Sequence, residues 1–273
     1  MIDSHCHLND ERFDEDRDLV LSRAAEAGVT HAVVVGYDLA SSRRAVELAN
    51  RTPQGPSPNL AAVVGVSTHL AAEWSDTVEE EIRQLLGMPG VVGLGETGLD
   101  FFYPEPAREI QERSLAAQLE IANELGIPVV FHLREAATEF FAILDRARFT
   151  GPGVLHCFTG DERAMREGVA RGLLVSFSGI VTFKKAADLL GVAKVTPLRN
   201  LLVETDAPYL APAPHRGKRC EPSHVIHTAE LLIRARGEDP LEFAQAMESN
   251  LLRLFPKLAS ARNQARASGA RLV

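Results

Sequence analysis

The chain has 273 residues, of which 45% are hydrophobic and 24% are charged, and its formal net charge at pH 7 is -8. This composition is ordinary for a globular protein, and an α/β barrel of this length can form one domain. The negative charge argues against a protein that grips long duplex DNA through a broad basic surface, because phosphate neutralisation dominates such binding. Any contact with nucleic acid should therefore be local.

The N-terminus lacks a basic region followed by an apolar stretch, and no apolar run approaches the ~18 residues of a membrane span. Three cysteines, Cys6, Cys157 and Cys220, are too few and too scattered for a disulfide framework or a Cys-x-x-Cys zinc site. We therefore expect a cytoplasmic protein with reduced thiols, no membrane contact and no obligate protein partner.

Short β-branched or apolar runs alternate along the chain with longer segments whose apolar residues recur at spacings of three and four. The runs predict strands at 2–7, 31–35, 60–66, 91–96, 128–132, 153–157, 173–177 and 200–204. The longer segments predict helices at 15–27, 41–50, 72–86, 107–125, 135–147, 161–170, 184–193 and 223–236.

Strand followed by helix, repeated about eight times, indicates an α/β fold of the (β/α)8 or TIM-barrel type. We expect residues 1–256 to form this single domain. The remaining segment, 257–273, has four basic residues and no acidic ones, and little helical periodicity. It is expected to be a mobile or only partly helical tail.

His5 and His7 lie two residues apart in the first predicted strand. Because side chains alternate along a strand, both imidazoles should point to the interior or mouth of the barrel. Two strand histidines that only hydrogen-bond each other would give the same pattern. The metal interpretation gains weight only if other strands end with similar residues.

Other strands do end in this way. Acidic or histidine side chains close or follow the fourth, fifth, sixth and eighth strands: Glu96, His132, His156 and Asp206. In a (β/α)8 barrel the C-terminal strand ends converge on one cavity. Each residue alone could be a core histidine, a helix cap or a turn former. Their joint occurrence at strand ends predicts a metal site there.

A carboxylate between two clusters can bridge two cations. We hypothesise that Glu96 joins a site of His5, His7 and Asp206 to a site of His132 and His156. Two cations roughly 3.5–4 Å apart could stabilise the attacking and leaving oxygens of phosphate cleavage. Asp206 would then orient or deprotonate the attacking water, which makes Asp206 and Glu96 the candidate catalytic residues.

Imidazole and carboxylate donors together suit zinc, manganese or iron, whereas magnesium uses fewer histidines. The identity of the two divalent ions is therefore open, and Mg, Mn and Zn are the candidates.

Five segments occur in the order and spacing of a known family. They read Asp3-Ser4-His5-Cys6-His7, Gly95-Glu96-Thr97-Gly98-Leu99-Asp100, His156-Cys157-Phe158-Thr159-Gly160, Glu204-Thr205-Asp206-Ala207-Pro208-Tyr209-Leu210 and Pro214-His215-Arg216-Gly217-Lys218-Arg219. Together they resemble the TatD deoxyribonucleases over about residues 1–255. The resemblance implies divalent-metal-dependent cleavage of phosphodiester bonds in DNA, often as 3′-5′ exonuclease trimming of single strands or ends.

One segment departs from the family pattern. Where the family commonly has Gly-x-His-Pro-His after the third strand, this chain has Gly65-Val66-Ser67-Thr68-His69. If the family's histidines contact the scissile phosphate, His69 keeps that role and the changed neighbours alter substrate positioning. Arg134 matches a family arginine placed to meet a phosphate, although a solvated or helix-paired arginine would look the same.

Two other functions stay open. An amidohydrolase-type deacetylase or lactonase also uses His-x-His on the first strand, but many binuclear members carry a bridging lysine where this chain has Glu96. A nucleic-acid-associated barrel without turnover is the non-enzymatic alternative, and only the incomplete histidine motif near His69 favours it.

Overall fold

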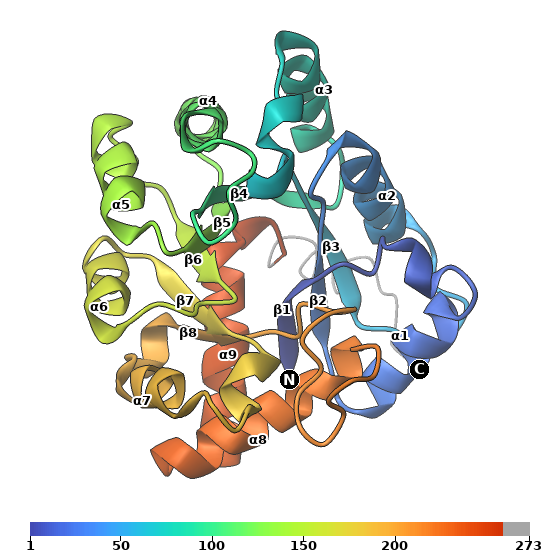
Figure 1. The fold of residues 1–273 in the computed structure, drawn as a ribbon. Coiled ribbons are helices and arrows are strands. Elements are labelled where there is room, and N and C mark those ends of the chain that lie inside the picture. The colour runs from blue at the N-terminus through green and yellow to red at the C-terminus, as the bar shows by residue number, and fades with distance from the viewer. Residues whose placement is uncertain (259–273) are drawn as a thin grey trace.

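The computed structural model describes residues 1–258. Eight parallel strands follow one another in chain order around a barrel, and helices surround them (Figure 1). The strands are β1 (Ile2–Cys6), β2 (His31–Val35), β3 (Asn59–Val64), β4 (Val91–Asp100), β5 (Val129–Arg134), β6 (Gly153–His156), β7 (Leu174–Phe177) and β8 (Leu201–Val203). The predicted (β/α)8 fold is therefore confirmed.

Each strand is followed by at least one helix. The α-helices of the described residues are α1 (Arg17–Glu26), α2 (Leu39–Asn50), α3 (Asp76–Leu86), α4 (Arg108–Leu125), α5 (Ala137–Arg146), α6 (Glu162–Ala170), α7 (Ala187–Val195), α8 (Val225–Arg236) and α9 (Pro240–Leu254). Short 3₁₀ helices interrupt the loops: η1 (Glu11–Phe13), η2 (Thr68–Glu73), η3 (Gly179–Thr182), η4 (Leu198–Asn200) and η5 (Pro222–His224).

The strands form because their residues are mostly β-branched or apolar and can be buried on both faces. The side chains of β2 and β8, for example, are all buried. The barrel interior and the layer between strands and helices thus form one continuous apolar core. Among the helices of residues 1–258, none combines the length and the hydropathy that a membrane crossing requires.

The seam between β8 and β1 closes through side chains as well as backbone. The buried Asp3 carboxylate accepts hydrogen bonds from the Thr205 backbone N–H at 2.9 Å and from its hydroxyl at 2.6 Å. The Asp206 N–H donates to the carbonyl of His5 at 3.0 Å. These contacts fix the segment after β8 directly beside β1.

The largest differences from the sequence predictions concern two elements. β4 continues past Glu96 to Asp100 and pairs along β5 as far as Arg134. Helix α9 was not predicted; its Asn250 side chain donates to the carbonyls of Leu198 and Leu201 beside β8.

The predicted tail, 257–273, falls outside the described residues except for Lys257 and Leu258. Leu258 is 9% exposed, and the Lys257 ammonium donates to the carbonyl of Val91.

Candidate metal centre

The six predicted metal ligands meet at the C-terminal ends of the strands, as the barrel topology requires. They come from β1 and the residue after it, from β4, β5 and β6, and from the turn after β8. The six residues are His5, His7, Glu96, His132, His156 and Asp206. Their donor atoms form adjoining groups, one of which joins His5, Glu96 and His156.

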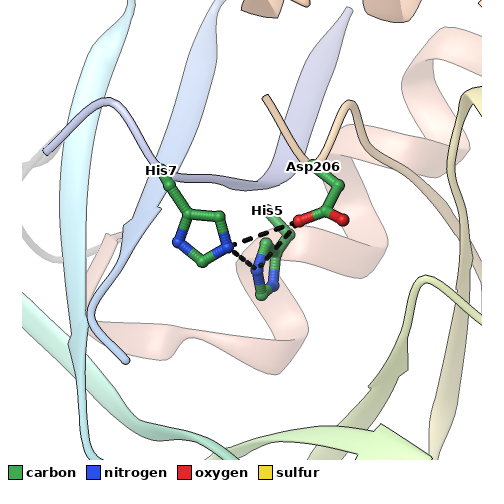
Figure 2. A group of neighbouring side chains, drawn as sticks. All are labelled: His5, His7 and Asp206. Carbon is green, nitrogen blue, oxygen red and sulfur yellow. Dashed lines mark hydrogen bonds and ion pairs between the residues drawn. The ribbon is translucent and has the colours of Figure 1, made fainter. Parts of the chain in front are cut away.

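The first metal group consists of His5, His7 and Asp206, whose side chains point toward one another (Figure 2). The Nε2 atoms of His5 and His7 are 3.2 Å apart. Asp206 Oδ1 lies 3.4 Å from Nε2 of His7 and 3.7 Å from Nε2 of His5. Three donors from the two sides of the barrel seam thus face one point.

Backbone geometry brings Asp206 to this point. Its φ is 59°, in the left-handed region that aspartate tolerates better than most residues. This conformation turns the chain sharply after β8, while the Asp206 N–H stays bonded to His5. The carboxylate is consequently held over the end of β1.

Glu96 lies between the two groups and directs one oxygen to each. Its Oε2 lies 3.6 Å from Nε2 of His5. Its Oε1 lies 3.2 Å from Nδ1 of His132 and 3.3 Å from Nε2 of His156. This is the arrangement expected of a carboxylate that bridges two cations. We call His132 and His156, together with Glu96, the second metal group.

Each histidine of the second metal group is backed by a carboxylate that was not predicted to be a site residue. Nε2 of His132 donates to Asp100 Oδ2 at 2.9 Å, and Nδ1 of His156 donates to Glu204 Oε1 at 3.4 Å. Such outer carboxylates fix the tautomer and orientation of a ligating imidazole. Here they leave a lone pair on each ring nitrogen that faces Glu96.

The donor set fits a cation on these grounds. The two facing nitrogens of His132 and His156 are 3.2 Å apart, and both carry lone pairs when the two imidazoles are neutral. Nδ1 of His7 donates to the carbonyl of Val35 at 2.9 Å, which likewise leaves its Nε2 free to accept. Lone pairs that converge at this distance repel unless positive charge lies between them.

The charges of the site are strongly coupled. Burial alone would raise the pKa of Glu96, but His156 and His132 hold it well below its usual range. Burial lowers the pKa of His156, yet Glu96 and Glu204 hold it well above the usual value. Burial and the neighbouring His156 and His7 lower the pKa of His5. A cation bound here would compete with protons for the same nitrogens.

The two predicted substrate contacts lie at the rim of the centre. His69 is in η2, its side chain is 45% exposed, and its Nε2 lies 3.7 Å from Asp100 Oδ2. His69, Asp100 and His132 also converge. However, Nε2 of His132 already donates to Asp100, so we interpret this third group as outer support rather than as a cation site.

Arg134 ends β5, two residues after His132, and its guanidinium lies over the ring of Phe102 at 3.7 Å. Within residues 1–258 no carboxylate forms an ion pair with it.

The sequence of this chain matches the model of the family described as "TatD related DNase" over residues 2–256. The chain belongs to the TatD family. It is therefore a metal-dependent hydrolase, and the convergent histidines and carboxylates are its candidate metal-binding side chains.

Curated relatives in the TatD family cover nearly the whole chain. One is the "Uncharacterized metal-dependent hydrolase YcfH" of Escherichia coli K12, 39% identical over 93% of this chain and 95% of the relative. Another is the "3'-5' ssDNA/RNA exonuclease TatD" of Cronobacter sakazakii, 38% identical over 95% of this chain and 99% of the relative.

A solved structure agrees with this assignment. The TatD homologue YJJV of Escherichia coli K12 superposes with a TM-score of 0.87 at 31% identity, and the match covers 94% of this chain and 98% of that one.

Proposed function

We propose that this TatD-family hydrolase is a nuclease that trims nucleic-acid strands, acting on single-stranded DNA or DNA ends from the 3′ side. The observation that carries the proposal is Glu96, whose two oxygens face two separate groups of ring nitrogens. Paired cation sites of this kind suit in-line displacement at phosphorus. The relative named as a 3′-5′ exonuclease supports the choice of substrate and polarity.

The proposed ligands are assigned to two divalent ions, with Mg, Mn and Zn as candidates. His5, His7 and Asp206 would hold one ion, His132 and His156 would hold the other, and Glu96 would contact both. When bound, the ions stabilise negative charge developing on the phosphate and lower the pKa of the attacking water.

Asp206 is the proposed proton acceptor for that water. The Asp206 side chain is 14% exposed, against 8% for Glu96. Of these two carboxylates, Asp206 is therefore the more open to the barrel mouth. Its Oδ1 faces His5 and His7, which leaves Oδ2 for the proton. Glu96 acts by holding the first and second metal groups in a fixed position relative to each other.

His69 and Arg134 are the proposed substrate contacts. The His69 ring lies 5.6 Å from that of His132, and Arg134 follows His132 by two residues on β5. The Arg134 guanidinium has no carboxylate partner among the described residues. An unpaired guanidinium beside a phosphodiesterase centre suits a phosphate oxygen.

The test measures turnover of a labelled single strand, the matching duplex and a p-nitrophenyl carboxylate ester, each with Mg²⁺, Mn²⁺ or Zn²⁺ after chelation. We expect stepwise shortening of the single strand. Glu96→Ala and Asp206→Asn should lower kcat by at least about 100-fold, since each removes a group that acts at the reacting centre. Glu47→Gln, on the exposed face of α2, is the control.

Two results would reject the nuclease proposal. Ester cleavage without loss of DNA favours the amidohydrolase-type alternative. Tight binding of DNA without turnover of any substrate favours a barrel that has lost catalysis. Wild-type kcat in Asp206→Asn with full metal content would reject the role of Asp206 alone.

A further inference from the structure

Aromatic side chains gather around the mouth of the barrel. All three tyrosines of the chain lie there, and each ring neighbours a histidine of the centre or of its rim. Tyr37 and Tyr209 lie 5.5 Å and 6.3 Å from His7, and Tyr103 lies 5.6 Å from His69, measured between ring centroids. This distribution places stacking surfaces where a substrate must enter.

The segment between β4 and α4 carries three consecutive aromatic residues with different surroundings. Phe101 packs against the core, as loop aromatics usually do. Phe102 and Tyr103 are each 49% exposed and meet edge to face at 4.9 Å. These two large apolar rings thus remain open to solvent beside a polar centre.

Arg134 joins the two open rings. Its guanidinium lies 3.7 Å from the Phe102 ring centroid and 5.4 Å from that of Tyr103. Across the mouth, Arg12 lies 4.4 Å from the Tyr209 ring, but it is bonded to Asp10 through two nitrogens. Arg134 has no such partner within residues 1–258, so its charge is free for a ligand.

Asp100 ties the open rings to the second metal group. Its Oδ1 accepts from the backbone N–H of Phe102 at 3.0 Å, while its Oδ2 accepts from Nε2 of His132 at 2.9 Å. The buried Gln111 also bonds the backbone of Asp100 on both sides, at 2.8 Å and 2.9 Å. The backbone of the aromatic segment is consequently held at a fixed place relative to a proposed metal ligand.

We propose that Phe102 and Tyr103, with Arg134 against them, form a stacking platform for the unpaired terminal base of a strand whose phosphodiester bond lies at the centre. The proposal rests on the proposed nuclease function and names the feature that selects single strands. Aromatic faces beside a positive group are the elements by which proteins bind single-stranded nucleic acid without sequence preference. A paired base presents no free face, so a duplex end must open first.

The kinetic test uses the variant Phe102→Leu/Tyr103→Leu, which keeps apolar bulk but removes both ring faces. On a labelled single strand we expect KM to rise by about 5- to 100-fold, the range corresponding to loss of base stacking. Phe102→Trp should retain the wild-type KM. Leu241→Ala, an exposed apolar residue on α9, is the matched control.

A strand whose terminal nucleotide is abasic separates stacking from structure. The wild type and the Leu variant should have the same KM on it. The platform proposal would be overturned if the Leu variant raised KM equally on the normal and the abasic strand. It would also be overturned if the variant left KM on the normal strand unchanged.

A binding measurement tests base stacking without requiring cleavage, so it is independent of the nuclease proposal. A strand ending in 2-aminopurine should show quenched fluorescence with the wild type in Ca²⁺ and no quenching with the Leu variant. If the wild type cleaves no strand, the nuclease proposal fails, and this readout still decides whether the rings stack a base. Equal quenching by both proteins would reject the platform.

Discussion

The tautomers of His132 and His156 are set by carboxylates that do not themselves face the shared centre. Glu204 is fully buried and accepts from both Nδ1 of His156 and the backbone N–H of Cys157, the latter at 2.7 Å. Without this acceptor the imidazole can place its proton on the nitrogen that faces Glu96. The outer carboxylate therefore favours the tautomer in which His156 can accept a cation.

Glu204→Gln tests this control with almost no change in side-chain volume. We expect the affinity for Mn²⁺ or Zn²⁺ to fall by about 10- to 100-fold, because the neutral amide lacks the negative charge with which a carboxylate partner raises the basicity of a ligating imidazole. Isothermal titration of the chelator-treated protein measures the change, and Glu47→Gln serves as the control. Unchanged affinity would mean that His156 is oriented by packing alone.

The sequence predicted which residues meet but not how they are supported. His5, His7, Glu96, His132 and Asp206 could be identified because each stands at a strand end, where topology alone forces convergence. A supporting hydrogen bond depends on the direction in which the side chain of another residue points. The order of strands along the sequence does not give this direction.

Asp100 shows the limit clearly. The predicted fourth strand ended at Glu96. The observed strand continues four residues further and carries Asp100 to the same edge as His132. The end of β4 is set by its pairing with β5 as far as Arg134, and the sequence of β4 alone does not show this pairing.

At the scale of elements, β4 owes its path to Gly98. A Cβ at this position would lie 1.9 Å from the backbone oxygen of His132, and the φ of 148° disfavours any other residue. The strand can approach β5 at this point only because the side chain is missing. The close approach brings Asp100 and His132 into contact.

Gly98→Ala should therefore destabilise the barrel by about 3 kcal/mol or more, from strain and overpacking together. Gly191→Ala is the matched control, because no atom lies within 4 Å of its Cβ position in α7. That change should be neutral or stabilising by up to about 1 kcal/mol. Urea unfolding of both variants gives the comparison, and similar midpoints for the two would contradict the close approach.

Helix α9 was missed although its start signals are present. Asp239 caps the helix by accepting from the N–H groups of Leu241 and Glu242, and Pro240 occupies the first helical position. The predicted elements already completed eight strand–helix units, so nothing in the repeat called for another helix. A helix outside the eight strand–helix units, such as α9, can be predicted only from its own capping residues.

At the scale of the whole molecule, the centre joins parts of the chain that are distant in sequence. The proposed ligands come from β1, β4, β5 and β6 and from the turn after β8, so two bound ions that share Glu96 would join five regions of the barrel. The β8–β1 seam, where Asp3 and Thr205 already bond, lies directly under the first metal group. Metal binding should therefore stabilise the fold as a unit.

Removal of metal provides the measure of this coupling. A ligand present at 100 times its Kd stabilises the folded state by about 2.7 kcal/mol. For a chain of this size that corresponds to a Tm about 5–10 °C lower in excess EDTA than in Mn²⁺ or Zn²⁺. Glu96→Gln should shrink the difference, because it weakens the one carboxylate shared by both groups. An identical Tm of the wild type with and without chelator would contradict this prediction. It would show that metal binding does not stabilise the barrel, although the ligands converge.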